Sequence, residues 1–506
     1  MVSSLIPFVT ATLGAIALSL AFPKTNAAVL APLGAAALFW AWFGVSPKRA
    51  FWVGWLAGTV FFAIDFWWFG ETAGALIAPF GFALALGPAV FDAFIGFALV
   101  GALVAFVARA LAGRDRVARA LVPLGAAAIF AVGEWFRSEG LGTIGVPFGG
   151  LGFTQVGSPL APIAALAGSY GVTFVVCTIG AYAAYALRLR AVRGSGIDAA
   201  VAAIAIVAFT AFAWLVWPAR SPAAPTHRVA AIQGNIAQGL KFAPGALAEA
   251  IARYETLTLR AAKSHPALIV WPETVIAAPL NRDPQLLARF STLAKKAHAE
   301  LVVGTDFVSP DGPYNVLYFF RPDGGLDAIY RKRQLVPFAE HVPFAAALGW
   351  IPWAQNASHF RSGTTSGLVA VDGLRYGPII CWESAFTDLV GDDVRAGASA
   401  LIVATDDAWF GTTSGPYQHA QIAQMRAIES GRWIVRAAAT GISGLIAPNG
   451  RYVRASALDE QAVVAGEIGE SSETPYDALG GNGIALMLAL VAGGVAFYGR
   501  RERRNG

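Results

Sequence analysis

Long runs of apolar residues fill most of the first 217 residues and return near the end of the chain. A helix needs about 20 consecutive apolar residues to cross a bilayer. The pattern predicts about eight spans, near residues 4–22, 27–45, 50–70, 80–109, 119–137, 159–187, 197–217 and 479–498. We therefore predict an N-terminal transmembrane bundle of seven spans over residues 1–220 and a C-terminal transmembrane helix over residues 479–498.

The stretch between the seventh and eighth spans has a different pattern, in which short apolar runs alternate with helical periodicity. Strands are predicted at residues 228–233, 267–271, 301–308, 315–320, 367–371, 376–380 and 400–405, and helices at 246–263, 283–299 and 418–430. Strands that alternate with helices, together with hairpin-like pairs, favour an α/β domain with a mixed sheet. We expect one such domain over residues 226–470.

The composition supports a protein that is embedded in a membrane. Hydrophobic residues make up 56% of the chain and charged residues 14%, whereas soluble domains carry about 25% charged residues. Two cysteines exclude a disulfide framework and a multi-cysteine zinc site. The six histidines show no paired spacing typical of metal ligands. We expect no metal, no cofactor and no nucleic-acid partner.

Lysine and arginine residues predict the orientation of the spans, because cytoplasmic loops are enriched in them. They gather in alternate loops, at 48–49, 109–119 and 188–193, and again in the tail at 500–504. Both termini are therefore expected in the cytoplasm and the 226–470 domain on the outer side. The first span lacks a basic start and a clear cleavage site, so we expect a membrane anchor there and not a signal peptide.

Cys381 is the first candidate for chemistry. It follows the apolar run Gly377–Ile380 and precedes Ser384–Asp388, which has the character of a helix start. A strand-to-helix turn of this kind can expose a nucleophile. The alternative is a small buried hydrophobic residue, a common fate of a free cysteine. We favour the nucleophile, because an unpaired thiol is a liability in an oxidising compartment unless it is used, and Glu383 lies beside it.

A carboxylate and an ammonium group complete the candidate site. Glu273 follows the apolar run Ala267–Pro272, and could act as a general base if partial desolvation raises its pKa. Lys332 lies in the basic segment Tyr330–Arg333, and its fixed charge could stabilise an oxyanion. The alternatives are a solvated carboxylate and a solvated lysine. A thiol, a carboxylate and an ammonium near strand ends suit acyl transfer through a thioester.

Glu273, Lys332 and Cys381 resemble the Glu-Lys-Cys triad of the nitrilase, or carbon–nitrogen hydrolase, superfamily. Longer strings resemble the apolipoprotein N-acyltransferase family, which completes bacterial lipoprotein maturation. These strings are Ile232–Ile236, Val270–Glu273, Tyr330–Glu340, Asp407–Gly411, Arg426–Arg432 and Thr440–Ser443. The resemblance covers the whole chain. It implies a polytopic helical membrane domain of about eight spans joined to a nitrilase-like αββα sandwich.

The resemblance also implies a reaction in two steps. Glu273 would be the general base, Cys381 the nucleophile and Lys332 the oxyanion stabiliser. Cys381 would take the sn-1 acyl chain of a phospholipid, typically phosphatidylethanolamine, as a thioester. The α-amino group of a lipoprotein's diacylglyceryl-cysteine would then receive the chain as an amide. The expected location is the bacterial inner membrane, as a multi-pass monomer whose catalytic domain faces the periplasm.

Further positions follow from the same resemblance. Glu340 and Glu383 match two carboxylates of the family's site and are expected to orient Lys332 and the thiol region. Phe242 and Trp382 are expected substrate-binding residues, where the family has Trp and Tyr respectively. Asp406 and Ala439 both stand where the family commonly has Asn. These departures concern substrate contacts or rate and leave the reaction class unchanged.

Two features remain outside the triad. The segment 342–360 carries Trp350 and Trp353 with little charge, and Trp favours the membrane interface. We interpret it as an arm that dips into the outer leaflet, the alternative being a buried loop. Asp65 and Asp92 lie within apolar spans. We expect Asp65 to reach the interface and Asp92 to hydrogen-bond to a neighbouring helix, and assign neither a catalytic role.

Two other functions remain open. A membrane-tethered nitrilase-type amidase would use the same thioester with water as the acceptor. A non-catalytic assembly platform or transporter would keep the triad as a relict. The spans, the arm and the motifs favour lipid substrates over the amidase. The intact triad argues against a non-catalytic protein, and no inverted repeat of the kind found in transporters is evident.

Overall fold

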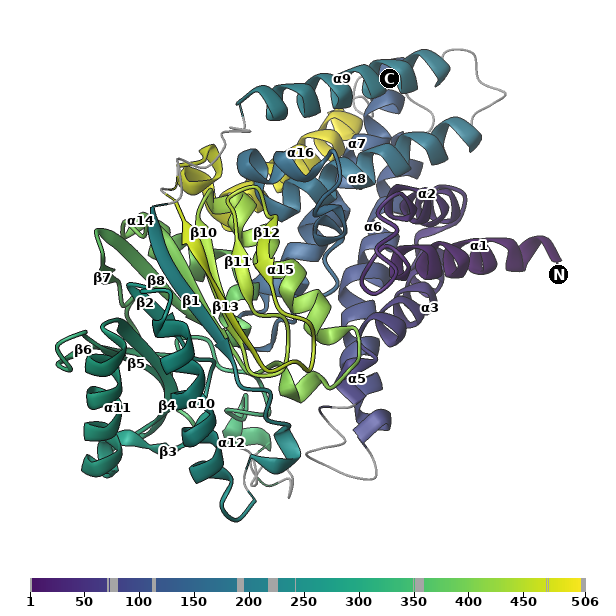
Figure 1. The fold of residues 1–506 in the computed structure, drawn as a ribbon. Helices are drawn as coiled ribbons and strands as arrows, with labels where there is room; N and C mark the ends of the chain where they lie inside the picture. The colour runs from purple at the N-terminus through teal and green to yellow at the C-terminus, as the bar shows by residue number, and fades with distance from the viewer. Residues whose placement is uncertain are drawn as a thin grey trace. The chain divides into compact units, whose positions relative to one another are not determined.

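The computed structural model of the chain describes residues 2–70, 72, 81–111, 115–188, 195–216, 226–241, 243–348, 350, 359–469, 471 and 473–501. It divides into two compact units (Figure 1). One comprises Met1–Pro218 and Leu479–Gly506, and the other comprises Ala219–Ala478. The first is helical, and the second contains all the described strands.

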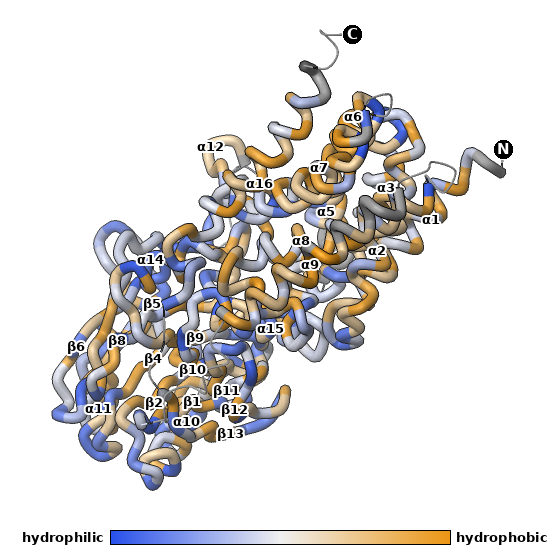
Figure 2. Tube along the Cα trace, turned by 90° about the horizontal axis from the view of Figure 1, so that it is seen from above, coloured by the Kyte–Doolittle hydropathy of each residue, from blue (hydrophilic) through white to orange (hydrophobic). Residues whose placement is uncertain are grey.

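Apolar helices build the first unit. They are α1 Val2–Ser19, α2 Leu30–Phe43, α3 Pro47–Asp65, α5 Gly81–Ala93, α6 Val100–Leu111, α7 Arg116–Trp135, α8 Ala164–Arg188, α9 Ser195–Val216 and α16 Pro475–Arg501. Hydrophobic residues predominate along them, as Figure 2 shows for α2 and α6. Among the described residues, four stretches are long and apolar enough to cross a membrane: Leu86–Leu111, Val117–Gly140, Ala161–Arg188 and Pro475–Tyr498. Shorter apolar helices occupy Ser4–Ser19, Leu30–Phe43 and Ile206–Leu215, so the count of about eight spans stays a prediction.

Small residues and buried charges shape this unit. A Cβ atom on Gly34 of α2 would lie 2.6 Å from the Gly14 carbonyl oxygen of α1, so glycine permits the two helices to approach closely. Arg137, in the π-helix Phe136–Gly140, donates a hydrogen bond to Asp92 at 3.4 Å. This confirms the expected bond from Asp92 to a neighbouring helix. The expectation for Asp65 is wrong, because its side chain is 3% exposed and lies inside the protein.

Two mixed sheets form the centre of the second unit. The first has the order β13-β1-β2-β4-β5-β6, with β3 paired to β4, and the second has the order β12-β11-β10-β9-β8-β7. The strands of the first are β1 His227–Gln233, β2 Leu268–Val270, β3 Ile276–Pro279, β4 Glu300–Ser309, β5 Gly312–Phe320, β6 Leu326–Arg331 and β13 Ala462–Ile468. Those of the second are β7 Val369–Val371, β8 Leu374–Ile380, β9 Ala400–Thr405, β10 Trp433–Ala438, β11 Gly444–Ile446 and β12 Tyr452–Ala455.

The two sheets pack face to face, with helices on their outer faces. One cluster of buried side chains joins residues of both sheets, among them Val270 of β2 and Ile402 of β9. A second cluster packs the outer face of the first sheet against α10 Ala246–Ala262 and α11 Pro284–Ala297. A third packs the second sheet against α14 Thr387–Arg395 and α15 Gly415–Ser430. The unit is therefore an αββα sandwich (Figure 1).

Each strand and helix predicted in this unit overlaps an observed one. The residue pattern indicated one mixed sheet, whereas the strands divide between two mixed sheets, as the implied αββα sandwich requires. Strand β2 runs parallel to β1 and β4, and β8 runs parallel to β9. The carboxyl ends of parallel strands are a common place for ligand sites, and Glu273 follows β2 while Cys381 follows β8 directly.

Candidate active site

The three residues predicted to perform chemistry come together in the sandwich. Glu273 lies beyond the end of β2, Lys332 follows β6, and Cys381 follows β8. The ammonium of Lys332 lies 2.8 Å from Glu273 Oε1. The charges of both Glu273 and Lys332 act on the Cys381 thiol. All three side chains are buried, with exposed fractions of 5% for Glu273, 1% for Lys332 and 8% for Cys381.

A second carboxylate pairs with Lys332, and a side-chain amide connects the two acids. Glu340 Oε2 lies 2.9 Å from Lys332 Nζ. The side-chain amide of Asn315, in β5, donates to Glu273 Oε1 at 2.7 Å and to Glu340 Oε1 at 2.9 Å. Buried charges persist where they are paired and hydrogen-bonded. The arrangement fixes the ammonium between two acids and leaves the three groups with one net negative charge.

The pKa values of this cluster follow from burial and pairing. Burial raises the pKa of Glu273, but the Lys332 ammonium and three hydrogen bonds outweigh it, so the net pKa lies below the usual range. Burial lowers the pKa of Lys332, but Glu273 and Glu340 raise it well above the usual value. Sequence reasoning made the base role of Glu273 conditional on a pKa raised by desolvation; the ion pair opposes the burial effect, and the net pKa is lowered.

The Cys381 thiol is protonated at rest. Burial raises its pKa well above the usual value and the Glu273 charge raises it further, while Lys332 and a hydrogen bond with Thr405 act in the opposite direction. Cys381 opens the short 3₁₀ helix Cys381–Ala385 with a φ of 51°. A residue with a side chain rarely adopts a positive φ, and such strain collects at functional sites.

Glu383 ties the nucleophile turn to the segment that carries Lys332. It accepts hydrogen bonds from the backbone N–H of Ile380 at 2.6 Å, of Gln334 at 3.2 Å and of Arg333, and from the Tyr330 hydroxyl at 2.8 Å. Its side chain is fully buried. Burial raises the pKa of Glu383, and the Arg333 guanidinium partly opposes this. Glu383 thus connects the backbone of the Cys381 turn to the backbone of the segment that carries Lys332.

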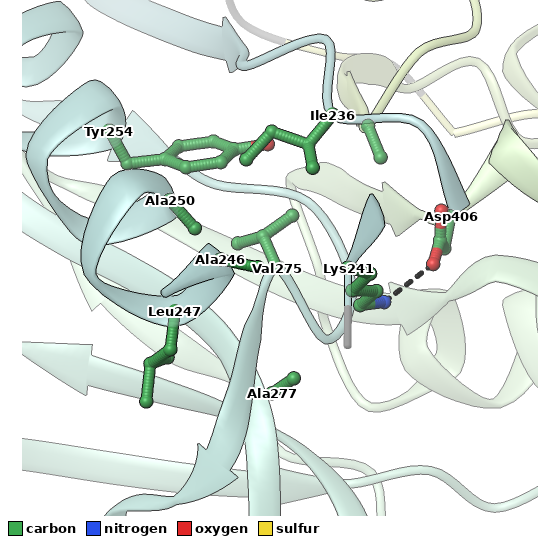
Figure 3. Close-up of a pocket in the computed structure, with 10 residues that line it drawn as sticks. Ile236, Lys241, Ala246, Leu247, Ala250, Tyr254, Val275, Ala277 and Asp406 are labelled. Atoms are coloured by element: carbon green, nitrogen blue, oxygen red, sulfur yellow. Dashed lines mark hydrogen bonds and ion pairs between the residues drawn. The ribbon is translucent and has the colours of Figure 1, made fainter. Parts of the chain in front are cut away.

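Asp406, one of the departures from the family pattern, lies against the candidate base. Its backbone N–H donates to Glu273 Oε2 at 2.9 Å. Its carboxylate pairs with Lys241 at 2.7 Å, and Lys241 also donates to the Thr274 hydroxyl at 3.0 Å. Figure 3 shows this ion pair at one side of a pocket of about 360 Å³, including space open to solvent. Lys241 therefore bonds to Thr274, which follows Glu273 in the chain, and to Asp406, whose backbone N–H contacts the Glu273 carboxylate.

The pocket beside the ion pair is mostly apolar. It is lined by Ile236, Ala246, Leu247, Ala250, Tyr254, Val275, Ala277 and Ala439 in addition to the ion pair. Figure 3 shows Leu247, Ala250 and Tyr254 on α10. Ala439, the second departure from the family pattern, is 5% exposed. Both departures thus line one pocket.

The other predicted site residues lie in different settings. Trp382 is 4% exposed, and its ring lies 6.3 Å from that of Phe386 in an edge-on arrangement. Phe242 and Trp353 lie outside the described residues. Trp350 is 75% exposed and Phe344, in the same segment, is 67% exposed. A buried loop is therefore the wrong interpretation for these two side chains.

Several polar residues of the site escaped the sequence analysis. Asn315 begins a predicted strand. An amide side chain in an apolar run indicates a hydrogen-bonded polar group in the interior, so this residue could have been identified. Thr405 ends a predicted strand and hydrogen-bonds to the thiol. Lys241 and His419 carry no local pattern that places them beside the site, because contacts across more than a hundred residues bring Lys241 to Asp406. Within the described ranges, no group of three metal-ligating side chains is present.

Known proteins are similar to both parts of the chain. Residues 14–182 match the family model of the apolipoprotein N-acyltransferase N-terminal domain, and residues 228–476 match that of carbon-nitrogen hydrolases. The apolipoprotein N-acyltransferase of Caulobacter vibrioides is 34% identical over 468 residues, which cover 88% of this chain and 85% of that protein. The chain belongs to the apolipoprotein N-acyltransferase family. The enzyme of that name from Pseudomonas aeruginosa is 32% identical and covers 88% of this chain and 87% of its own length.

Solved structures resemble part of this chain. Saccharomyces cerevisiae Nit3, of the nitrilase superfamily, is 21% identical with a TM-score of 0.39, over 48% of this chain and 90% of that one. The apolar helices and the family together identify a membrane protein with a nitrilase-like carbon–nitrogen hydrolase domain.

Proposed function

We propose that this protein is an apolipoprotein N-acyltransferase that moves an sn-1 acyl chain from a phospholipid to the N-terminal diacylglyceryl-cysteine of lipoproteins. The observation that carries the proposal is the Lys332–Glu273 ion pair of 2.8 Å beside a buried thiol at a strained turn. A nucleophile, a base and a fixed cation are the three groups that acyl transfer through a thioester requires. Cys381, Glu273 and Lys332 fill these roles in that order.

In the first step, Glu273 accepts the thiol proton while the sulfur bonds to the sn-1 carbonyl carbon of the donor. The carbonyl oxygen becomes an oxyanion that the Lys332 ammonium stabilises. The carbon–oxygen bond to glycerol then breaks, and the departing glycerol oxygen takes the proton from Glu273. The products are a lysophospholipid and an acyl thioester on Cys381.

The pKa values make this proton transfer depend on the substrate. At rest the thiol pKa is raised and the Glu273 pKa is lowered, so transfer in the empty site is unfavourable. The oxyanion that forms beside Lys332 competes with Glu273 for the ammonium. Because the ion pair is what lowers the Glu273 pKa, this competition strengthens the base as charge develops.

In the second step, the neutral α-amino group of the lipoprotein attacks the thioester carbon. Glu273 accepts a proton from the attacking nitrogen, the carbon–sulfur bond breaks, and the thiolate takes that proton back. An amide and the free enzyme result. Glu340 and Asn315 hold Lys332 and Glu273 through both steps, and Glu383 holds the Cys381 turn. Trp382 and Phe242 contact substrate in this proposal.

The finer topology belongs to the same proposal. It comprises about eight spans, seven in residues 1–220 and one at 479–498, with a catalytic domain at 226–470. The arginine-rich alternate loops support an inner-membrane location with this domain in the periplasm. A phosphatidylethanolamine donor, a diacylglyceryl apolipoprotein acceptor and a monomeric state complete it.

The segment around Trp350 supports an arm that meets the outer leaflet. Phe344 and Trp350 expose 67% and 75% of their surfaces, although exposed aromatic side chains are unfavourable in water. Trp rings prefer the membrane interface. The acyl chain of the donor must leave the bilayer to reach Cys381, and Trp350 would border that path.

Mass spectrometry of an acceptor separates this function from a water-using amidase. A diacylglyceryl lipoprotein peptide and phosphatidylethanolamine vesicles are incubated with wild-type protein and with Cys381→Ala, with Cys177→Ala as a matched control. We expect the peptide to gain the mass of one acyl group with wild type and Cys177→Ala only. Release of free fatty acid with no mass gain would support the amidase instead.

A further inference from the structure

A carboxylate that the two steps do not use lies beside the candidate base. Asp306, in β4, is the direct partner of Asn315 in the antiparallel pairing of β4 with β5. Residues paired in this way share one face of a sheet, with Cβ atoms about 5 Å apart. The Asn315 amide donates to both Glu273 and Glu340. Asp306 therefore lies on the same face as the amide that connects the two acids.

A glycine in β4 brings the Glu273 segment close to this carboxylate. A Cβ atom on Gly304 would lie 2.0 Å from the Pro272 carbonyl oxygen and 2.8 Å from the Glu273 Cα atom. The segment that carries Glu273 thus lies directly against the β4 backbone. Side chains two positions apart on a strand share a face and are about 7 Å apart along it. Asp306 is therefore next to the place where the base meets the sheet.

Two buried acceptor atoms in this place have no donor among the described residues. They are Asp306 Oδ1 and Asn315 Oδ1. The orientation of the Asn315 amide is fixed, because its nitrogen donates to two carboxylates and its oxygen can only accept. A buried acceptor without a donor costs free energy, so each such atom calls for an explanation. A primary ammonium, which carries three N–H donors, would satisfy both.

The charges around Asp306 make it a base. Glu273 and Glu340 both pair with the Lys332 ammonium, at 2.8 and 2.9 Å. Burial raises the Asp306 pKa, Lys241 opposes this, and the charges of Glu340 and Glu273 add to it, which gives a pKa of about 6. At neutral pH the group is therefore a carboxylate, and it binds a proton more strongly than an ordinary aspartate does.

The second step of the proposed reaction needs one more proton acceptor. An α-amino group has a pKa of about 7.7–8.0, so the lipoprotein acceptor is mostly an ammonium ion at pH 7. This ammonium must lose one proton before it can attack the thioester, and the nitrogen loses a second proton when the amide forms. Glu273 and the Cys381 thiolate account for the second proton only. The first proton needs a different base.

We propose that Asp306 and Asn315 form the subsite for the acceptor's α-ammonium group, and that Asp306 is the base that removes its first proton. Both Oδ1 atoms accept hydrogen bonds from the bound ammonium. One N–H bond then breaks: its electron pair stays on nitrogen and the proton moves to Asp306. The neutral amine attacks the thioester carbon, and Asp306, which is partly exposed, returns the proton to solvent. The inference rests on the proposed function, because it places the acceptor of that reaction.

Aminolysis of a preformed acyl-enzyme tests this assignment. Acyl-enzyme made from phosphatidylethanolamine is freed of donor and mixed with subsaturating diacylglyceryl peptide from pH 5 to 9, and the amide is measured by mass spectrometry. With wild type the rate should rise through about pH 6, the pKa of Asp306. Asp306→Asn should rise only near pH 8 and be about tenfold slower at pH 7, because about a tenth of the amine is neutral there. Asp323→Asn, which changes an exposed carboxylate between β5 and β6, should match wild type.

Two further measurements separate a lost base from a damaged site. Hydroxylamine is mostly neutral at pH 7, so it should cleave the acyl-enzyme of Asp306→Asn at the wild-type rate. Acyl-enzyme formation should also be unchanged. Slower formation from phosphatidylethanolamine but not from phosphatidylglycerol would place the donor's headgroup ammonium in the subsite and overturn the assignment.

Three other results would overturn it. They are a wild-type profile for Asp306→Asn, a loss with hydroxylamine as large as that with the peptide, and a wild-type rate that rises only near pH 8. The last of these is measured on the unaltered chain and does not depend on the folding of a variant. Wild-type protein that forms no acyl-enzyme would contradict the proposed function, whereas the three results above leave that function intact.

Discussion

Replacing Lys241 with methionine removes the partner of a buried carboxylate. Lys241 and Asp406 are 12% and 2% exposed, and their charged atoms lie 2.7 Å apart. Methionine keeps the apolar stem but leaves Asp406 with the Ala408 N–H as its one other described side-chain bond. Leaving a buried charge without its partner costs about 3–5 kcal/mol. Since Lys241 is partly exposed, we expect about 3 kcal/mol, the lower end of that range.

The loss should appear as a lower melting temperature of the catalytic unit. One kcal/mol shifts Tm by about 2–4 °C in a domain of this size, so about 3 kcal/mol predicts a drop of about 6–12 °C. Scanning fluorimetry of the detergent-purified chain measures the melting temperature. Loss of acyl transfer over the same temperature range identifies the transition of the catalytic unit. Lys296→Met, an exposed lysine on α11, serves as the control. Asp406→Asn keeps the acceptor without the charge, so the double variant should recover most of the loss.

The pH dependence of the stability loss in Lys241→Met is an independent test. Burial raises the Asp406 pKa, and Lys241 lowers it only in part. Removal of Lys241 should raise this pKa further. The folded state of Lys241→Met then binds more protons than the unfolded state at intermediate pH, so its stability falls as pH rises through the raised pKa. The drop in Tm should therefore be smaller at pH 5 than at pH 8. An unchanged Tm, or a double variant as unstable as Lys241→Met, would refute the reasoning.

Three further predictions concern the site and the arm. Glu340→Gln should slow acyl-enzyme formation about 10–100-fold in stopped-time assays, because Lys332 loses a charged partner; an unchanged rate would remove Glu340 from the site. Glu383→Gln should destabilise the catalytic unit by about 1–3 kcal/mol in denaturation experiments, because an amide cannot accept all four bonds at once; equal stability would show that these bonds are dispensable. Trp350→Ser combined with Trp353→Ser should raise the phospholipid concentration needed for half-maximal rate and leave the maximal rate unchanged; unchanged kinetics would eliminate the arm.

The sequence allowed the local parts of the fold to be predicted because periodicity is a local property. The apolar run before Glu273 and that before Cys381 both form buried strands. The division into two sheets did not follow from the residue pattern, since strand pairing is set by long-range packing; only the resemblance to the nitrilase superfamily implied it. Strands β10 and β13 were missed although they pair with β9 and β1. Gly431, the αL residue that ends α15, was an available signal for the start of β10.

The candidate site shows the same limit. The triad could be identified from residue types beside strand ends. The charge states of its three groups could not be predicted from the sequence. The base role of Glu273 was made conditional on a pKa raised by desolvation, and the ion pair with Lys332 gives a net lowering instead. Likewise, no local pattern connects His419 to Asp407 or Arg436. Burial can be inferred from one segment, whereas electrostatic pairing depends on segments that only the folded chain brings together.

The most direct test is to trap the acyl-enzyme. Purified protein is incubated with phosphatidylethanolamine and no acceptor, digested, and analysed for acylated peptides with and without hydroxylamine, which cleaves thioesters. We expect one acyl chain on the peptide that contains Cys381, removed by hydroxylamine and absent from Glu273→Gln. An acyl chain on a different residue, or lipoprotein acylation that proceeds in Cys381→Ala, would contradict the account.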